Sequence, residues 1–548
     1  MMKFLSRKPK VPAPVVPNSN TACDVVIVGG GHNGLVCAAM LSKAGLKVTL
    51  LEALPQLGGM AASDEISPDV RVSTCAHLVY AMDERVIKEL KLHKHGLLFA
   101  KNKMSTVAPD GEGNAVHLHH DIWKTQAGLR VFSDSDATAY PKFREKMQAH
   151  ALAWRSFMVS SPVNFQSTGL DAVEKYFERI KTLTESDRRE FLRLLVSSSG
   201  DILDETFESD LLKGALAFDS VLGLNAGPRS MNSMAHYLYR LSGEAAFGRE
   251  AMAVVSGGMS TLADALSAAA RAYGSNIRTG AKVVRILAKK GAACGVELDD
   301  GERVIAPLVI SNADPRTTYL NLVGVESLDT GFSTRVRALR SEGVTAKMNL
   351  VLDGLPMFRG LTQEDLSHRI VICPSIDFAE RAFNPVKYGS FSHDPIFEVT
   401  IPTLHDSTLT SRDKHIISAN VQYVPYKVAG GWPKRRDELV EQLVKALNYF
   451  APDINNRIVS GHVLTPLEIE QEYGCSGGHW HHGDFALDQL GALRPANGAG
   501  VYGAPVAGLY LCGAGVSGGG ITGLPGLTAA EHVLADLRTS RKAGASIL

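Results

Sequence analysis

A glycine-rich turn between an apolar run and a helical pattern is the feature that most constrains this chain. Asp24–Val28 has the composition of a buried strand, and Leu35–Lys43 has the pattern of a helix. Between them stand Gly29, Gly31 and Gly34 in the spacing G-x-G-x-x-G. The first glycine permits a tight turn, the second lets the backbone approach a pyrophosphate, and the third allows close helix–strand packing. The turn therefore predicts a dinucleotide site at a helix N-terminus, where free N–H groups favour phosphate.

The residues after this helix complete the same unit. Gly45 suits the end of the helix, and Lys47–Leu51 predicts a second strand. Glu52 closes that strand 18 residues after Gly34, where an acid accepts hydrogen bonds from ribose hydroxyls. A glycine-rich turn in an unrelated α/β domain is the remaining alternative.

Length and composition limit the kind of protein. A chain of 548 residues is too long for one simple core, so two consecutive or intertwined domains are expected. Basic and acidic residues balance at 57 each, which gives no electrostatic reason to expect nucleic acid as a partner. The seven dispersed cysteines form no C-x-x-C pair and are typical of reduced thiols in an intracellular protein. No apolar run of about 18 residues is present, so we expect no transmembrane segment, and peripheral membrane contact stays open.

The N-terminal segment, residues 1–22, is basic, rich in proline and free of acidic residues. This composition predicts a disordered leader on a cytoplasmic protein. A transit peptide for the mitochondrial matrix is the alternative, but four prolines between residues 9 and 17 interrupt any amphipathic helix.

Three separated stretches resemble the superfamily of FAD-dependent oxidoreductases that includes amine oxidases and phytoene desaturases. Leu57–Met60 carries a second glycine pair soon after the acid, 254–286 is similar to the superfamily's middle element, and 509–533 is similar to its C-terminal flavin element. The resemblance implies FAD as the cofactor. Besides Gly29, Gly31, Gly34 and Glu52, it implies these cofactor-binding residues: Gly58, Gly59, Met60, Val283, Gly513, Gly523 and Leu524.

The C-terminal element also has a physical interpretation of its own. Tyr510–Cys512 predicts a short buried strand, and Gly513–Gly523 is a loop with almost no side chains. Pro525 suits the first position of the helix that follows. A glycine loop that ends in a helix N-terminus can approach a planar ring, and the positive end of the helix would stabilise the negative charge of reduced flavin.

Two further runs narrow the resemblance. ISNADP at 310–315 is like the desaturase branch. The run GG-x-x-x-HG-x-x-x-x-DQL at 477–490, followed by Arg494-Pro495, resembles the pyridine nucleotide-disulphide oxidoreductase domain-containing protein 2 group and its bacterial relatives. Dithiol chemistry is not expected despite that name, because Cys75 stands alone where two cysteines would have to face the flavin.

The resemblance implies an α/β fold: a Rossmann-type FAD-binding domain assembled from three sequence segments, with an inserted α+β substrate domain. The predicted boundaries are 23–105, 246–320 and 495–540 for the FAD-binding domain, and 106–245 and 321–494 for the substrate domain. Amphipathic helices are expected in the substrate domain at Ala172–Leu183 and Arg435–Phe450.

Lys347 is the first candidate catalytic residue. It begins a predicted strand, Met348–Leu352, and amine-oxidase relatives hold a water on flavin N5 with a lysine at about this distance beyond the flavin domain. Burial would lower the pKa of such a lysine and let it order water or O2. An exposed lysine at a strand edge is the alternative.

A histidine-rich stretch, GGHWHHGDFALDQL at 477–490, is the second candidate site. Its three histidines cannot converge from a regular strand, and the neighbouring glycines favour a loop. His482 matches the group's motif histidine and is predicted to face the flavin as an acid/base or orienting residue. Roles for His479 and His481, including a covalent flavin link, stay open, and Asp488 with Gln489 can equally be a structural pair.

A metal site is not expected from these histidines. A second cluster, HLHHD at 117–121, follows a turn-like run and is predicted to be a hairpin with solvent-facing histidines. Neither cluster has the ligand spacing of a closed zinc site.

The sequence therefore predicts an FAD-dependent oxidoreductase that takes a hydride equivalent from a C–H bond of a small organic substrate onto flavin N5. The resemblance leaves two substrate classes: an apolar polyene or lipid that is desaturated, or an amine whose oxidation releases peroxide. A flavin-binding interaction module with little catalysis is a third alternative.

Overall fold

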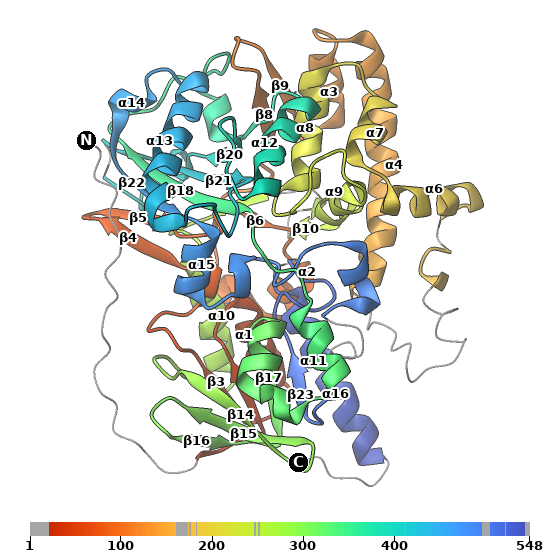
Figure 1. Ribbon diagram of the computed structural model, residues 1–548, viewed down its shortest axis with the longest axis vertical. Helices are drawn as coiled ribbons and strands as arrows, with labels where there is room; N and C mark the ends of the chain where they lie inside the picture. The colour runs from red at the N-terminus through yellow and green to blue at the C-terminus, as the bar shows by residue number, and fades with distance from the viewer. Residues whose placement is uncertain are drawn as a thin grey trace.

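A computed structural model describes residues 21–159, 174, 177–181, 183–245, 248–249, 252–411, 413–495, 505–520 and 522–542. Residues 1–20 of the predicted leader lie outside these residues, and residues 21–22 form the first strand. Of the predicted helix Ala172–Leu183, residues 172, 173, 175, 176 and 182 lie outside them, and residues 174, 177 and 178 are helical. Figure 1 shows two lobes, one below the other, which we call the parallel-sheet lobe and the mixed-sheet lobe after their largest sheets.

The parallel-sheet lobe is built on five parallel strands that come from three distant stretches of the chain. Their order across the sheet is β13 (Asn276–Arg278), β3 (Val48–Leu51), β2 (Val25–Val28), β17 (Leu308–Ser311) and β23 (Leu509–Leu511). β2, β3, β17 and β23 are buried along their whole length, as expected for a parallel sheet covered on both faces. The expectation of an α/β domain assembled from three sequence segments is confirmed.

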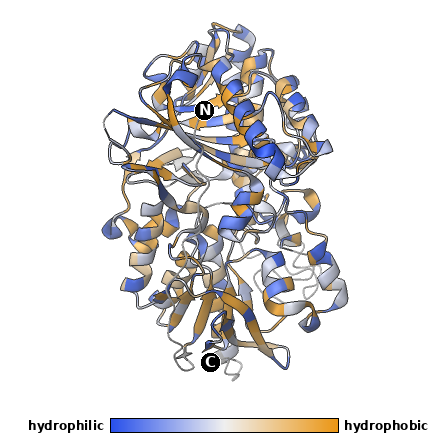
Figure 2. Cartoon of the chain, turned by 60° about the vertical axis from the view of Figure 1, so that its left-hand side comes forward, coloured by the Kyte–Doolittle hydropathy of each residue, from blue (hydrophilic) through white to orange (hydrophobic). Residues whose placement is uncertain are grey.

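Helices and a second sheet cover this parallel sheet. The helix after the glycine turn, α1 (His32–Lys43), packs against α10 (Ser260–Ala272) and α16 (Leu524–Lys542). The other sheet has the order β1 (Thr21–Ala22), β16 (Arg303–Ile305), β15 (Ala292–Leu298) and β14 (Val283–Lys289). Figure 2 shows the apolar colour concentrated on the strands of this lobe, where its core lies. α16 begins at Leu524, so Pro525 occupies the second helical position and not the predicted first.

The mixed-sheet lobe contains seven strands. Their order is β22 (Ile458–Leu464), β18 (Thr345–Leu352), β21 (His415–Gln422), β20 (Ile396–Thr400), β19 (Arg369–Ile372), β8 (Thr106–Pro109) and β9 (Ala115–Leu118). The predicted helix Arg435–Phe450 is present as α13 (Trp432–Phe450), which begins three residues earlier than predicted. Its apolar stripe, with Leu439, Leu443 and Leu447, packs into the core of this sheet.

A layer of helices stands beside the mixed sheet. It comprises α3 (Ile122–Leu129), α4 (Asp134–Val159), α6 (Glu185–Val196), α7 (Ser199–Asp204), α8 (Asp210–Val221) and α9 (Ser233–Ser242) (Figure 1). The smaller elements are β4 (Ser63–Ser67), β5 (Val70–Ser73), β6 (Val79–Tyr80), α2 (Glu84–Leu90), β7 (Phe99–Lys101), β10 (Glu244–Ala245), β11 (Gly248–Arg249), β12 (Met252–Val255), α11 (Thr330–Arg337), α12 (Ile376–Phe383), α14 (Ile454–Arg457) and α15 (Pro466–Tyr473). None of the helices described has the length and apolar character needed to cross a bilayer.

Strand register in the mixed sheet creates a polar row that matters for the site. Lys347 of β18 pairs with Asn420 of β21, and Asn420 pairs with Glu398 of β20. Directly paired residues place their side chains on the same sheet face, so these three side chains stand side by side across three strands. All three are buried.

Candidate active site

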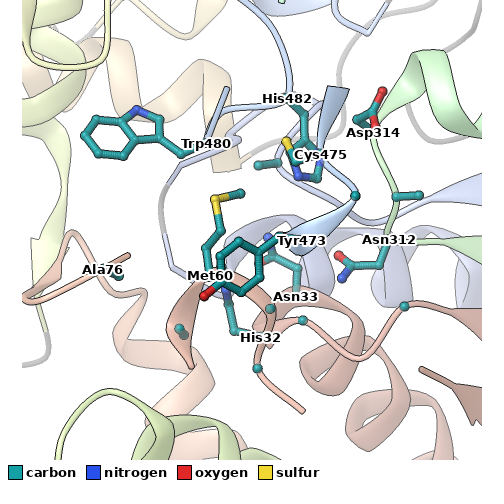
Figure 3. A pocket seen from close by; sticks show the side chains of 18 of the residues that line it. His32, Asn33, Met60, Ala76, Asn312, Asp314, Tyr473, Cys475, Trp480 and His482 are labelled. Atoms are coloured by element: carbon teal, nitrogen blue, oxygen red, sulfur yellow. The ribbon is translucent and has the colours of Figure 1, made fainter. Parts of the chain in front are cut away.

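A cavity of about 430 Å³ lies between the two lobes. Gly29 and Asn312 line it just beyond the carboxyl ends of β2 and β17, and Val283 lines it from the start of β14. Leu222 and Trp480 line it from the mixed-sheet lobe. Figure 3 shows Met60 and Tyr473 together in the middle of the view, with Asn33 below them and Cys475 and Trp480 above. Ligands of open α/β sheets bind at this edge of the sheet.

Two glycine turns form the floor of the nucleotide end. Gly58 donates its backbone N–H to the carbonyl oxygen of Gly30 at 2.9 Å, and Gly31 forms an isolated bridge with Gly58. A Cβ added to Gly31 would lie 2.8 Å from the Asn312 amide nitrogen, and one added to Gly58 would lie 2.9 Å from Ala263 Cβ. These contacts leave no room for side chains, so the backbone itself borders the cavity.

Glu52 stands at the end of β3, where the sequence predicts a ribose-binding acid. Its carboxylate accepts the backbone N–H of Gly30 at 2.6 Å and that of Leu54 at 2.8 Å, and it borders the cavity. Burial raises the pKa of Glu52, although these hydrogen bonds oppose the shift. The carboxylate therefore ties the glycine turn to the second strand as well as facing the cavity.

The predicted cofactor-binding residues divide into two groups. Those that line the cavity are Gly29, Gly31, Glu52, Gly58, Gly59, Met60 and Val283. The second group lies behind the lining and contributes to packing: Gly34, Gly513, Gly523 and Leu524. For example, a Cβ on Gly34 would meet the Gly29 carbonyl oxygen at 2.2 Å, and Leu524 is fully buried. In the C-terminal element the cavity is lined by Ala514, Gly520 and Thr522, which the sequence had not distinguished from their neighbours.

Three residues of the nucleotide end were not predicted. His32 and Asn33 open α1, and Asn312 follows β17; all three border the cavity. Asn33 is 3% exposed, and its Oδ1 finds no hydrogen-bond partner among the described residues. A buried acceptor with no partner indicates that a ligand donor belongs there. The position of Asn312 just beyond a parallel strand was the available signal.

The histidine-rich segment forms a loop, as predicted, and its histidines have separate positions. His481 and His482 line the cavity, whereas His479 lies behind them and accepts the backbone N–H of His481 on its Nδ1 at 3.2 Å. Burial lowers the pKa of His479 to about 3 and that of His482 to about 4. The loop thus presents neutral imidazoles. Among the described residues, no three His, Cys, Asp or Glu side chains are placed to share a metal ion.

His482 has a backbone φ of +57°, which is unusual for a residue with a side chain. Residues held in this region cluster at sites where function requires one side-chain position. Its Nδ1 would be 3.1 Å from a Cβ on Gly513, so the glycine makes room for this ring. The position of His482 in the cavity lining is consistent with the predicted flavin-facing role, which stays a prediction.

Arg494 holds the loop in place. The side chain is 4% exposed and donates to carbonyl oxygens of Gly483 at 3.2 Å and Ala514 at 3.2 Å, and also to that of His481. It therefore joins the histidine loop to the C-terminal glycine loop. Asp488 and Gln489 lie outside the cavity lining: the exposed Asp488 carboxylate pairs with Arg340, and Gln489 bonds the Arg340 backbone.

Lys347 is fully buried and its Nζ lies 2.6 Å from Nδ1 of His77. Its strand β18 is paired on both sides and the side chain is buried, so the alternative of an exposed lysine at a strand edge is wrong. Burial lowers the pKa of Lys347 to about 7. His77 lines the cavity and Lys347 stands behind it. His77 was not predicted, because it lies in no motif and meets Lys347 only through a contact across 270 positions of sequence.

Two other sequence interpretations can now be checked. Cys475 borders the cavity, but burial raises the pKa of its thiol well above the ordinary value and that of Cys75 to about 12, so both stay protonated.

The histidines of HLHHD were predicted to face solvent, and this is wrong for His117 and His119. Both are half-buried and stacked on each other, because His117 Nε2 lies 2.8 Å from Asp365 Oδ1 and is thereby held against the protein.

Comparison with known proteins identifies the family. The sequence profile described as "Flavin containing amine oxidoreductase" matches residues 34–351. Pyridine nucleotide-disulfide oxidoreductase domain-containing protein 2 of Rattus norvegicus is 31% identical over 544 residues, with 94% of each chain covered. The chain belongs to the flavin-containing amine oxidoreductase family. It is thus an FAD-dependent oxidoreductase, and the predictions of cofactor and enzyme class are confirmed.

Two further proteins are similar to this chain over most of its length. One of the subunits of limonene dehydrogenase from Castellaniella defragrans is 28% identical over 539 residues, covering 94% of this chain and 95% of the relative. The crystal structure of wild-type putrescine oxidase bound to putrescine superposes with a TM-score of 0.58 at 16% identity, covering 95% of this chain and all of that one. The second similarity shows the shared fold.

The residues at the nucleotide end fit FAD. Gly29, Gly31 and Gly58 would hold the diphosphate by close backbone approach, and Glu52 would accept from a ribose hydroxyl. Asn33 Oδ1, which has no hydrogen-bond partner among the described residues, offers a further acceptor for FAD in the same part of the cavity.

Proposed function

We propose that this protein removes a hydride equivalent from a C–H bond of a largely apolar organic substrate. When bound, FAD supplies the electron-accepting chemistry by taking the hydride at N5. The protein supplies a shaped space for the substrate, in which Leu78, Leu222 and Trp480 form an apolar part of the lining. Apolar lining favours burial of an apolar substrate and excludes water from the reacting atoms.

The observation that carries this proposal is the state of the carboxylates that line the cavity, which among the described residues are those of Glu52, Asp314 and Glu398. Glu398 accepts Arg369 Nε at 2.6 Å and Asn420 Nδ2 at 2.8 Å, so its charge is already matched. Arg240, which also lines the cavity, pairs with Asp219 at 3.0 Å and lies 4.3 Å from the Tyr80 ring centroid. Asp314 accepts Thr317 Oγ1 at 2.6 Å and the backbone N–H of Arg316 at 2.9 Å. The three carboxylates thus already hold hydrogen bonds from the protein, whereas a hydrocarbon substrate needs no charged partner.

The limonene dehydrogenase relative supports the same substrate class, since limonene is a hydrocarbon. Oxidation of an amine with release of peroxide is the second candidate. The buried Lys347, with its pKa lowered to about 7, favours that candidate because a neutral amine beside the cavity can serve in O2 or water chemistry.

An anaerobic panel distinguishes these candidates. Holoprotein is mixed without oxygen with unsaturated hydrocarbons including limonene, with polyunsaturated lipids, with hydroxy compounds and with amines including putrescine. We expect an unsaturated apolar compound to bleach the flavin absorbance and the amines to leave it unchanged. Air is then readmitted and peroxide is measured. Bleaching by amines alone would overturn the apolar proposal, and bleaching by nothing would favour a binding module.

A further inference from the structure

Arg240 lies where the main cavity, of about 430 Å³, adjoins a second cavity of about 70 Å³. Arg240 and Tyr80 line both cavities. A water molecule needs roughly 10–15 Å³ of such space, so the second cavity admits a group larger than one water. The Arg240 side chain is 12% exposed. Its guanidinium is therefore a largely buried charge that borders space for a ligand.

One edge of this guanidinium is held by the protein. Arg240 Nε donates to Asp219 Oδ1 at 3.1 Å, and Nη2 lies 3.0 Å from the same oxygen. The guanidinium carbon lies 4.3 Å from the centroid of the Tyr80 ring, and the Tyr80 hydroxyl donates to the Arg240 backbone carbonyl oxygen at 2.7 Å. These contacts orient the planar group before any ligand binds.

The other terminal nitrogen of Arg240, Nη1, is not engaged in the same way. A guanidinium has five N–H donors, and two of them are on Nη1. Among the described residues, none accepts a hydrogen bond from Nη1: the polar contacts of this side chain are those of Nε and Nη2 with Asp219, and an approach of Nη2 to Glu398 at 3.9 Å. Donors in largely buried positions are almost always matched. An acceptor from a ligand or from water therefore belongs at Nη1.

The neighbouring charges indicate which kind of acceptor fits. Arg369 Nη2 donates to Asp219 at 2.6 Å, and Arg369 Nε donates to Glu398 at 2.6 Å. The guanidiniums of Arg240 and Arg369 thus balance the carboxylates of Asp219 and Glu398, and a carboxylate ligand would add an unmatched charge to this largely buried group. Both carboxylates are already engaged by protein donors, whereas a carbonyl oxygen accepts and has nothing to donate. An uncharged carbonyl therefore fits best.

We propose that the substrate carries a carbonyl group whose oxygen accepts a hydrogen bond from Arg240 Nη1, while its apolar part occupies the main cavity. This inference rests on the function proposed above and narrows its substrate class to an apolar ketone, aldehyde or ester. Arg240 is then a specificity-determining residue. A plain hydrocarbon leaves Nη1 without an acceptor, and a site built to hydrogen-bond one group of its substrate discriminates against the analogue that lacks it.

The first test compares four compounds that share one carbon skeleton. Limonene is a hydrocarbon, carvone a ketone, carveol an alcohol, and perillic acid a carboxylate at pH 8. Binding to oxidised holoprotein is measured without oxygen from the change in flavin absorbance. Arg240→Lys keeps a positive charge for Asp219 but offers no nitrogen in place of Nη1. We expect it to weaken the binding of carvone about tenfold or more, to weaken carveol less, and to leave limonene unchanged.

Arg435→Lys makes the same substitution in similar surroundings outside both cavities. Arg435 Nε donates to Glu438 at 2.6 Å, and its guanidinium carbon lies 4.9 Å from the Phe391 ring centroid. This variant should leave the ratio of carvone to limonene affinity unchanged. If Arg240→Lys also leaves that ratio unchanged, water satisfies Nη1 and the proposal is overturned, as it is by a failure of carvone to bind. A larger loss for perillic acid than for carvone would replace the carbonyl with a carboxylate and overturn the assignment.

The second test uses the wild-type protein, so it holds even if Arg240→Lys does not fold. The carbonyl stretch of carvone, labelled with 13C at that carbon, is measured by infrared spectroscopy in the bound state. We expect a lower frequency than in hexane, because a hydrogen bond from a charged donor is strong and weakens the C=O bond. A stretch at the hexane position overturns the proposal. Neither test needs turnover: if carvone binds through Arg240 but no compound of the anaerobic panel reduces the flavin, the proposed function fails and the carbonyl site stands.

Discussion

Gly31→Val should yield a folded protein that binds FAD much more weakly than the wild type. The added Cβ would lie 2.8 Å from the Asn312 amide nitrogen, and the rest of the side chain would enter the cavity beside the glycine turn. Overpacking of this kind costs roughly 1–3 kcal/mol, and each 1.4 kcal/mol changes affinity about tenfold. We expect affinity for FAD to fall by about 100-fold, measured by flavin fluorescence during titration of the apoprotein.

Gly128→Val is the matched control. Gly128 lies in α3, and a Cβ there meets nothing within 4 Å. This variant should bind FAD as the wild type does. A yellow Gly31→Val protein with unchanged affinity would show that the diphosphate does not approach this turn.

Arg494→Met should destabilise the protein more than any other single change discussed. The buried guanidinium satisfies carbonyl oxygens in both loops of the cavity wall, including those of Gly483 and Ala514. Its removal leaves buried acceptors without donors, at about 1–3 kcal/mol for each group. We expect the free energy of unfolding to fall by about 3–5 kcal/mol, measured by urea denaturation of the holoprotein.

Arg340→Met tests whether the effect belongs to this position. Arg340 lies nearby but pairs with Asp488 at the surface, and both side chains are more than half exposed. Exposed pairs contribute about 0–1 kcal/mol. Equal losses in the two variants would contradict the role assigned to Arg494 as the link between the loops.

Local patterns were sufficient to predict the parallel-sheet lobe. Strand, glycine turn, helix and acid are consecutive in sequence from Asp24 to Glu52, and each has a local physical signature. The glycine pair at 58–59 was equally informative, since its backbone must lie close to the first turn. The C-terminal loop was located correctly, but which of its residues border the cavity depends on how the chain turns between 513 and 523.

The catalytic end of the site could not be predicted in the same way. His77 and Lys347 are 270 positions apart, and Asn420 joins them only through strand register. The sequence indicated Lys347 through its predicted strand and through the family resemblance. No local pattern indicated His77, whose ring separates Lys347 from the cavity. The histidine loop shows the same limit: spacing indicated a loop, but the φ of +57° at His482 and the supporting position of His479 come from packing.

The most direct test of the proposed reaction is a single turnover with deuterium. The apolar compound that bleaches the flavin is prepared with deuterium at the carbon from which hydride is removed. Anaerobic reduction of the holoprotein is then followed by rapid mixing. We predict that the deuterated compound reduces the flavin severalfold more slowly than the protiated one. Equal rates at saturating concentration, with deuterium retained in the product, would contradict hydride removal from that C–H bond.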